Sequence, residues 1–555
     1  MFKKDKEIKE AEESLPIIFS SRETEKQKNI VLVILSALFK SVIIALSALA
    51  AAISLGSAFL ANNEYLGAWI GILLFAIVLN NFRKLSISLL YCFVVGFTFN
   101  LILLYWIYPT VQFGTQEQVM SFLSLFGLSA LMALQFVLFG LLYFYIKSLT
   151  WVLPAAAACL WVSIEFLHQV IAFNFFAFPW FVLGYSQFEN LAFIQISSVT
   201  GAYGVSFIIV FVCFSVAMLF GSYKAKQKIL FTFLSVLLLG FNFLFGKSEI
   251  KKQTELINTT PNQIKVALMQ PNTHGLLLLG KGEQAYSVLR KQSLALKGKG
   301  VEFIIWPETS LEGTFTSKEN KEFLKSISEA YQAPQLFGGS QVKEGKLYVG
   351  AALFTKEGIV DSYQKNKLVP FGEFLPFQNI LGGFYENSGI TSMTGDFSAG
   401  KHLDKILNLS INKAGFPFGV NICFEALFPK IWRSQAAAGA QFFVNISNDG
   451  WFLDTAAPLQ HLRINVFRSI ENRRPVLRAT TTGYNAWIDS LGNIRFRSEN
   501  LFEQETAIFD FKFQTRGKKT FYTAFGDIFA LVCVFFTVSF WGVAMAFYVQ
   551  ETYGK

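Results

Sequence analysis

The sequence predicts a multi-pass α-helical membrane domain of about eight transmembrane helices, followed by an extracytoplasmic α/β domain. Charged residues make up only 15% of the 555 residues, whereas hydrophobic residues make up 53% and the mean hydropathy is +0.42. Long apolar runs fill the first 250 residues, and residues 251–519 change to short β-like runs that alternate with amphipathic helical patterns. So few charges would not cover a soluble protein of this size, but they suffice where much of the surface faces lipid.

The membrane domain is predicted from runs that reach the ~20 apolar residues needed to cross a bilayer. Seven such runs precede residue 250 and an eighth lies near the C-terminus, at residues 32–60, 65–82, 86–108, 119–147, 149–168, 200–221, 228–246 and 522–547. The first thirty residues are charged and the apolar run after them is too long for a signal peptide, so no cleavage is expected.

The positive charges predict the orientation. Lysines and arginines fall on one side of the apolar runs, at Lys3, Lys4, Lys6, Arg83, Lys84, Lys147, Lys224, Lys226 and Lys228. The opposite loops, 62–65, 110–118 and 173–195, carry none. The positive-inside rule therefore puts the N-terminus in the cytoplasm, and seven spans place the α/β domain outside. The net charge of +10 is scattered rather than gathered in one patch, which favours contact with anionic membrane lipid and not nucleic acid.

The predicted division is a cytoplasmic extension 1–29, a transmembrane domain 30–250, an α/β domain 251–519 and a C-terminal transmembrane helix with a short tail 520–555. Short β-like runs predict strands at 264–270, 301–306, 335–340, 347–354, 418–423, 442–447 and 476–481. Amphipathic patterns predict helices at 283–296, 318–331, 427–438 and 458–472. Strands and helices that alternate in this way are typical of an α/β fold.

Cys423 is the one cysteine of the α/β domain, since Cys92, Cys159, Cys213 and Cys533 fall in predicted spans. It is either a small buried side chain or a reactive thiol. Its place between a strand and a helix favours reactivity, because the helix dipole would stabilise the thiolate. A metal site is not expected, because the histidines of this domain show no ligand spacing.

Glu308 and Lys365 are the residues that would assist such a thiol. Glu308 follows the apolar run VEFIIWP, where a carboxylate serves either as a base or as a helix cap. Lys365 lies in an aromatic and apolar stretch, where it is either part of a site or a surface charge. A thiol needs a base or a cation nearby to attack a carbonyl at neutral pH.

Three motifs coincide in order and spacing: WPETS around Glu308, YQKNKLVPFGEFLPF around Lys365 and NICFEALFP around Cys423. Together they resemble the nitrilase superfamily, whose catalytic set is Glu, Lys and Cys on an αββα sandwich. The motifs FAFPWFVLGYSQ and VNISNDGWF, together with the membrane half, narrow the likeness, and the chain resembles the apolipoprotein N-acyltransferase family. The sequence departs from the family pattern at Phe424, where tyrosine is common, and at Gly450, where alanine is more usual.

The resemblance implies transfer of a fatty acyl chain from a membrane phospholipid to the α-amino group of a diacylglyceryl apolipoprotein. It implies that Glu308 is the base, Cys423 the nucleophile that becomes a thioester, and Lys365 the cation that stabilises the oxyanion. The transfer would follow ping-pong kinetics in the bacterial inner membrane, with the sandwich in the periplasm. No cofactor is expected, and the protein is expected to act as a monomer.

Further candidates surround this set. Glu373 would orient Lys365, Glu425 would position the amine or cap a helix, and Asn448 would give polar support or form a turn. Residues expected to contact lipid or substrate are Phe178, Pro179, Trp180, Phe374 and Trp451. Glu165 lies in a span, where a carboxylate either has a function or pairs with a neighbouring helix.

Two stretches, 271–282 and 371–399, are too apolar for loops in water. They are interpreted either as lids that dip into the outer leaflet and exclude water from the thioester, or as internal packing or a helix. Two rival functions remain: a membrane-tethered amidase that uses the same three residues, and a transporter or receptor that binds ligand on the sandwich. The near absence of charge within the spans argues against a transporter.

Overall fold

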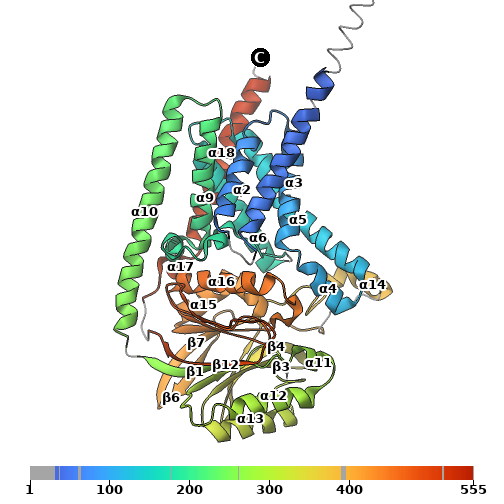
Figure 1. Cartoon of the computed structure of the whole chain (residues 1–555), viewed down its shortest axis with the longest axis vertical. Coiled ribbons are helices and arrows are strands. Elements are labelled where there is room, and N and C mark those ends of the chain that lie inside the picture. The colour runs from blue at the N-terminus through green and yellow to red at the C-terminus, as the bar shows by residue number, and fades with distance from the viewer. Residues whose placement is uncertain are drawn as a thin grey trace, which may run out of the picture.

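The computed structural model describes residues 32–36, 38–60, 64–175, 177–260, 262–388, 395–514 and 518–553. A bundle of long helices stands on a layered α/β domain, and the C-terminal helix returns to the bundle (Figure 1). The predicted N-terminal extension 1–29 lies outside the described residues.

The bundle contains seven helices in the described part of the chain that are long and apolar enough to cross a membrane. They are Leu32–Ser57, α3 (Leu85–Leu103), α5 (Gln118–Ile146), α6 (Leu153–Asn174), Ala202–Phe220 with α9 (Ala202–Ala217) at its start, α10 (Ala225–Asn258) and α18 (Ile528–Tyr553). The predicted second span, 65–82, forms α2 (Leu66–Leu79), which has only 14 residues. This helix is shorter than the ~20 residues of a full span. It packs with a buried face against the bundle.

Short helices connect the spans on the side that faces the α/β domain. They are α4 (Ile107–Thr115), α7 (Leu191–Ile194) and α8 (Ser197–Thr200). Between α6 and α7, the described residues 177–182 have no regular secondary structure and lead to a 3₁₀ turn at Leu183–Gln187. This segment leads from the bundle toward the α/β domain, where Trp180 contacts Gln460.

Two six-stranded sheets form the centre of the α/β domain. The first has the order β12-β1-β2-β3-β4-β5 and the second β11-β10-β9-β8-β7-β6. The strands of the first sheet are β12 (Glu505–Lys512), β1 (Gln263–Gln270), β2 (Phe303–Ile305), β3 (Gln335–Lys343), β4 (Lys346–Thr355) and β5 (Gly358–Gln364). Those of the second are β11 (Ile494–Arg497), β10 (Ala486–Ile488), β9 (Val476–Thr480), β8 (Phe442–Ser447), β7 (Ala414–Ile422) and β6 (Ile406–Ile411).

Helices cover both outer faces of the sheets, so the predicted α/β domain is an αββα sandwich. Apolar side chains of the two facing sheets fill the centre. Helices α12 (Gly282–Leu294) and α13 (Lys318–Tyr331) cover the first sheet, and α15 (Pro429–Ala438) and α16 (Ala457–Asn472) cover the second. The fold class predicted from the sequence is therefore confirmed.

Helix α16 lies between the second sheet and the bundle (Figure 1), and all of its residues are buried. Gln460 donates hydrogen bonds to the carbonyls of Phe59 and Leu103, at 3.1 and 3.2 Å, and Arg463 donates one to the carbonyl of Leu60 at 2.7 Å. These bonds satisfy carbonyls near the ends of membrane helices, which have no partner within their own helix. The α/β domain is therefore fixed to the bundle by polar contacts as well as by packing.

All seven predicted strands and four predicted helices of the α/β domain correspond to observed elements, with shifts of a few residues at their ends. Prediction missed β5, β6, β10, β11 and β12. The helices α11 (His274–Leu278) and α14 (Gln378–Ser388) lie in the two apolar stretches, for which a helix was one of the alternatives. β5 and β6 are edge strands, and in β5 only Tyr363 is buried, so no apolar run marks it. One predicted boundary is wrong at the site: β7 ends at Ile422, and Cys423 begins a 3₁₀ turn, Cys423–Leu427, before α15.

Candidate active site

Three strand ends meet at one end of the sandwich. Glu308 follows β2, Lys365 directly follows β5 and Cys423 directly follows β7. The first two strands belong to one sheet and the third to the other. The fold therefore brings together a carboxylate, an ammonium and a thiol from segments that lie far apart in the sequence.

Lys365 lies between two carboxylates. Its Nζ is 3.0 Å from Oε1 of Glu308 and 2.7 Å from Oε1 of Glu373, and its side chain is fully buried. Burial alone lowers the pKa of Lys365, but the charges of Glu308 and Glu373 outweigh it and hold the pKa well above its ordinary value. The lysine is therefore a fixed cation.

Backbone and side-chain donors hold the two carboxylates in place. Oε2 of Glu308 accepts a hydrogen bond from the backbone N–H of Asn448 at 3.0 Å, and Oε2 of Glu373 accepts one from the N–H of Val369 at 2.8 Å. Asn448 thus contacts Glu308 through its backbone N–H, and its predicted role as polar support stays a prediction. The side chain of Asn448 instead lies 3.0 Å from Nδ1 of His274.

Cys423 has a backbone φ of +48°, in the left-handed region that residues other than glycine rarely adopt. Burial and the charge of Glu308 raise the pKa of its thiol above the ordinary value, and Lys365 only partly offsets them. The prediction that a helix dipole stabilises the thiolate does not describe this site, since a five-residue 3₁₀ turn follows the cysteine. The resting group is a neutral thiol, which needs a base to lose its proton.

Glu425 connects the segments that carry the lysine and the thiol. Its Oε1 accepts hydrogen bonds from the backbone N–H of Asn366 at 2.6 Å and from the hydroxyl of Tyr363 at 2.8 Å, and its Oε2 accepts one from the N–H of Ile422 at 2.8 Å. Burial raises the pKa of Glu425 to about 7 despite these donors. The side chain is fully engaged in holding two strand ends together.

A second polar cluster lies beneath the thiol and was not assigned a role from the sequence. Nε2 of His461, on α16, is 3.0 Å from the carbonyl oxygen of Cys423. Its Nδ1 is 3.2 Å from Oδ1 of Asp449, whose Oδ2 accepts a hydrogen bond from Arg478 at 2.6 Å. Burial and the adjacent Arg478 lower the pKa of His461, so the ring is neutral. Asp449 lies in the motif VNISNDGWF and His461 in the predicted helix 458–472, but only the fold brings these two residues together.

The residues predicted to contact lipid differ in how far they are buried in the protein. Phe178 stacks on Phe424, the residue after the thiol, at a ring separation of 5.8 Å. Trp180 is buried and donates a hydrogen bond to Oε1 of Gln460 at 2.7 Å, and Pro179 is also buried. Trp451 packs on the ring of His274 at 4.9 Å, and Phe374 is half-buried. Their role in binding lipid stays a prediction.

His274 also accounts for the space beside Gly450. A Cβ at Gly450 would lie 2.5 Å from the His274 ring. Such a distance is well inside ordinary van der Waals contact, so alanine at this position would displace the ring. Gly450 therefore leaves the space that the ring of His274 occupies.

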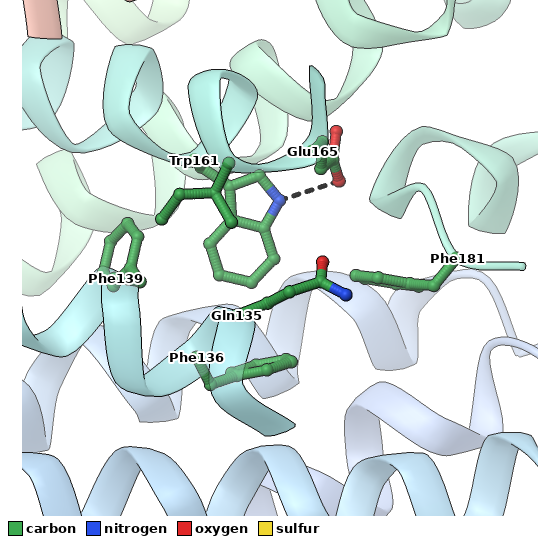
Figure 2. A pocket seen from close by; sticks show the side chains of 7 residues that line it. Gln135, Phe136, Phe139, Trp161, Glu165 and Phe181 are labelled. Atoms are coloured by element: carbon green, nitrogen blue, oxygen red, sulfur yellow. Dashed lines mark hydrogen bonds between the residues drawn. The ribbon is translucent and has the colours of Figure 1, made fainter. Parts of the chain in front are cut away.

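Glu165 lies within the bundle and away from the three strand ends. Its Oε1 accepts hydrogen bonds from Nε1 of Trp161 at 2.9 Å and from the backbone N–H of Leu183 at 2.8 Å. Figure 2 shows this side chain beside the other residues that line a small pocket. The cavity has a volume of about 20 Å³, which is room for a single water molecule. The cavity is lined by Gln135, Phe136, Phe139, Trp161, Ile164, Glu165 and Phe181. Glu165 thus fixes the segment that carries Phe178 and Trp180.

The two apolar stretches predicted as lids contain short helices. Residues 271–282 include α11 (His274–Leu278), after which Leu279 is 69% exposed. Residues 371–399 include α14, where Ile380 is 81% exposed. In Figure 1, α14 lies at the level of the junction between the bundle and the α/β domain. Residues 389–394 of the second stretch lie outside the described residues, and closure over an acyl chain stays a prediction.

The comparisons with known proteins agree with this architecture. Residues 265–519 match the family model of carbon-nitrogen hydrolases, and residues 51–215 match that of the apolipoprotein N-acyltransferase N-terminal domain. Fold and domain content thus define a membrane-embedded enzyme of the carbon-nitrogen hydrolase class.

Proteins with similar sequences identify the family within this class. An apolipoprotein N-acyltransferase of Geobacter metallireducens is 31% identical over 68% of this chain and 71% of its own length. One of Nitrosomonas europaea is 30% identical over 79% and 86%. The chain belongs to the apolipoprotein N-acyltransferase family. Among solved structures, an amidase from Nesterenkonia sp. AN1 is 16% identical, with a TM-score of 0.33, and covers 45% of this chain and 93% of its own.

Proposed function

We propose that this protein transfers an acyl chain from a membrane phospholipid to the α-amino group of a diacylglyceryl apolipoprotein through a thioester on Cys423. Family membership supports lipoprotein N-acylation as the reaction. The observation that supports the assignment of residues is the fully buried Lys365, held between Glu308 and Glu373 at the strand ends where Cys423 also lies.

In the first half-reaction, Glu308 removes the thiol proton while Sγ of Cys423 attacks the carbonyl carbon of a phospholipid ester. The oxygen of that carbonyl becomes an oxyanion beside the ammonium of Lys365. A fixed cation or donor aimed at such a charge contributes about 3–4 kcal/mol in a dry site. When the C–O ester bond breaks, Glu308 returns the proton to the leaving alkoxide, which departs as the lysophospholipid hydroxyl.

In the second half-reaction, the α-amino group of the lipoprotein attacks the thioester carbonyl and Glu308 accepts a proton from the amine. The C–S bond breaks, the new amide forms, and the proton returns to the thiolate of Cys423. Glu373 keeps Lys365 in position and Glu425 keeps the two strand ends together. Two successive acyl transfers through one covalent intermediate give ping-pong kinetics.

Mass spectrometry of the intact protein tests this proposal. After incubation with phospholipid alone, the wild type should gain the mass of one fatty acyl chain, and a diacylglyceryl peptide with a free amino group should remove it. Cys423→Ala should never gain this mass, whereas the control Cys533→Ala, altered in α18, should gain it as the wild type does. A wild type that hydrolyses small amides but forms no phospholipid adduct would instead be a membrane-tethered amidase.

We also propose that the protein lies in the bacterial inner membrane as a monomer, with the α/β domain in the periplasm. The distribution of lysine and arginine between the loops supports this orientation. The proposed domain limits remain 1–29, 30–250, 251–519 and 520–555, and the exposed apolar side chains of α14 support its role as part of a lid. Protease protection of spheroplasts tests the orientation, because residues 318–331 should be cleaved only from the periplasmic side.

A further inference from the structure

Two lysines share one aromatic ring at the end of a membrane helix. Phe173 is the penultimate residue of α6. Nζ of Lys367 lies 4.1 Å from the centre of its ring, and Nζ of Lys430 lies 4.5 Å from the same centre. Lys367 also donates a hydrogen bond to the backbone carbonyl of Phe173. Two segments of the α/β domain thus bring positive charge to one point of the bundle.

This lysine pair, Lys367 and Lys430, has no carboxylate partner within 4 Å among the described residues. Burial and the charge of Lys430 lower the pKa of Lys367. Glu425 acts in the opposite direction, but its oxygens are engaged by Asn366, Tyr363 and Ile422. Like charges held together without a counter-ion favour the binding of an anion.

The lysine pair is connected to the candidate nucleophile by aromatic rings. Phe173 packs on Phe428 at a ring separation of 5.9 Å, and Phe428 packs on Phe424 at 5.4 Å. Phe424 is the residue after Cys423. Two successive ring contacts therefore join the ring beneath the lysine pair to the residue beside the thiol.

The surface next to the lysine pair is suited to lipid. α6 ends at Asn174, on the side of the bundle that faces the α/β domain (Figure 1). Val170, Ile171 and Phe175 around this end are 37%, 38% and 77% exposed. Exposed apolar side chains at the end of a membrane helix face the acyl chains, and cations just beyond them lie at the level of lipid phosphates.

We propose that Lys367 and Lys430 bind the phosphate group of the phospholipid donor and so orient its ester toward Cys423. This inference rests on the proposed function and adds a headgroup site to it. Glycerol joins the phosphate of such a lipid to its esters, so a phosphate on the lysine pair would hold the ester on the side of the aromatic cluster that carries Cys423. The chemistry recognised is the phosphate diester, which phospholipids share whatever their headgroup.

The test measures the rate of acyl-enzyme formation by full-length protein against the mole fraction of phosphatidylglycerol in detergent micelles. We expect Lys367→Gln/Lys430→Gln to raise the half-saturating fraction about 10- to 30-fold, because each lysine contributes modestly to binding anionic lipid. The maximal rate should stay within about twofold, since neither lysine touches the reacting atoms in this proposal. Lys367→Arg/Lys430→Arg should remain close to wild type.

A matched control is Lys343→Gln/Lys346→Gln, which alters two lysines paired across the β3–β4 hairpin, and it should change nothing. Diacylglycerol has the same esters without phosphate, so its half-saturating fraction should be equal in the wild type and in Lys367→Gln/Lys430→Gln. An unchanged half-saturating fraction for phosphatidylglycerol would overturn the headgroup site while leaving the acyl-enzyme intact. A wild type that forms no acyl-enzyme from either donor would instead remove the proposed function itself.

Inorganic phosphate separates a lipid headgroup from a free ion. At millimolar concentration it should leave the wild-type rate unchanged, because the lipid is also held by its acyl chains. Strong inhibition of the wild type that disappears in Lys367→Gln/Lys430→Gln would show a site for free phosphate and overturn the assignment to lipid.

Discussion

Replacing Lys365 by methionine tests the central charge of the site. The ammonium lies 3.0 Å from Glu308 and 2.7 Å from Glu373, and no water-exposed surface remains on its side chain. Without it, two buried carboxylates face each other without a cation. Breaking a buried ion pair on one side destabilises a protein by about 3–5 kcal/mol. For a domain of this size, that loss corresponds to a fall in melting temperature of roughly 6–20 °C.

The loss in Lys365→Met should depend on pH. In the folded variant, burial and mutual repulsion would raise the pKa of the carboxyl pair above the ~4.3 of an unfolded glutamate. The folded variant would then bind a proton that the unfolded chain releases, so its stability falls as the pH rises from about 5 to 8. Wild type, in which Lys365 neutralises one carboxylate, should lack this additional slope.

Melting curves in one detergent at one scan rate, at pH 5.5 and pH 8, measure both effects. Lys365→Met/Glu373→Gln carries one buried carboxylate fewer and should recover more than half of the lost melting temperature at pH 8. Both variants should form acyl-enzyme about 10²–10³ times more slowly than wild type, because the oxyanion has lost its cation. If Lys365→Met melts within 2 °C (about 1 kcal/mol) of wild type at pH 8, the lysine does not hold the two carboxylates together.

Three further changes test other contacts of the site. Burial raises the pKa of Glu425 to about 7, so the wild type should lose about 3 kcal/mol of stability as the pH rises from about 4.5 to 7. Glu425→Gln should not show this loss. Melting temperatures of both proteins across this pH range measure the difference. Gly338→Ala should slow acylation and lower the melting temperature, because the new Cβ would lie 2.5 Å from Cα of Glu308. The control is Gly127→Ala, whose Cβ would have nothing within 4 Å, and it should match wild type. His461→Ala should lower the maximal acylation rate about 10- to 100-fold without changing the half-saturating phospholipid fraction. His461→Gln still donates a hydrogen bond and should restore most of the rate. A changed half-saturating fraction with an unchanged maximal rate would contradict a positioning role for His461.

The sequence was sufficient to predict the main elements because their signals are local. Apolar runs of spanning length, and strands such as β8 in which every residue is buried, are visible without knowledge of their neighbours. Lys365 was recognisable as unusual because it lies in an apolar and aromatic stretch, and the structure buries it completely. Edge strands such as β5 lack this signal, since most of their side chains are not buried.

The contacts that set charge and pKa at the site could not be predicted from local sequence signals, because they join segments that are distant in the sequence. His461 lies on α16 and Asp449 follows β8, and only the packing of that helix on the second sheet brings both beneath Cys423. The pKa of the thiol was expected to be lowered by a helix and is raised by burial and Glu308, because the helix starts later than predicted and Glu308 lies close. Charge and burial at a site depend on every segment around it.

The strand order of the first sheet constrains how the chain matures. β1 pairs along its whole length with β12, from Gln263 opposite Lys512 to Gln270 opposite Glu505, although more than 230 residues separate the two strands. The first strand of the α/β domain is thus completed by the last, after which come α17 (Phe521–Phe525) and α18, and α18 packs on α6. Synthesis must therefore reach Lys512 before that sheet can close, so a chain arrested before β12 carries an unpaired β1 edge. Such an open edge can pair with a strand of another chain, so nascent chains arrested there are expected to aggregate.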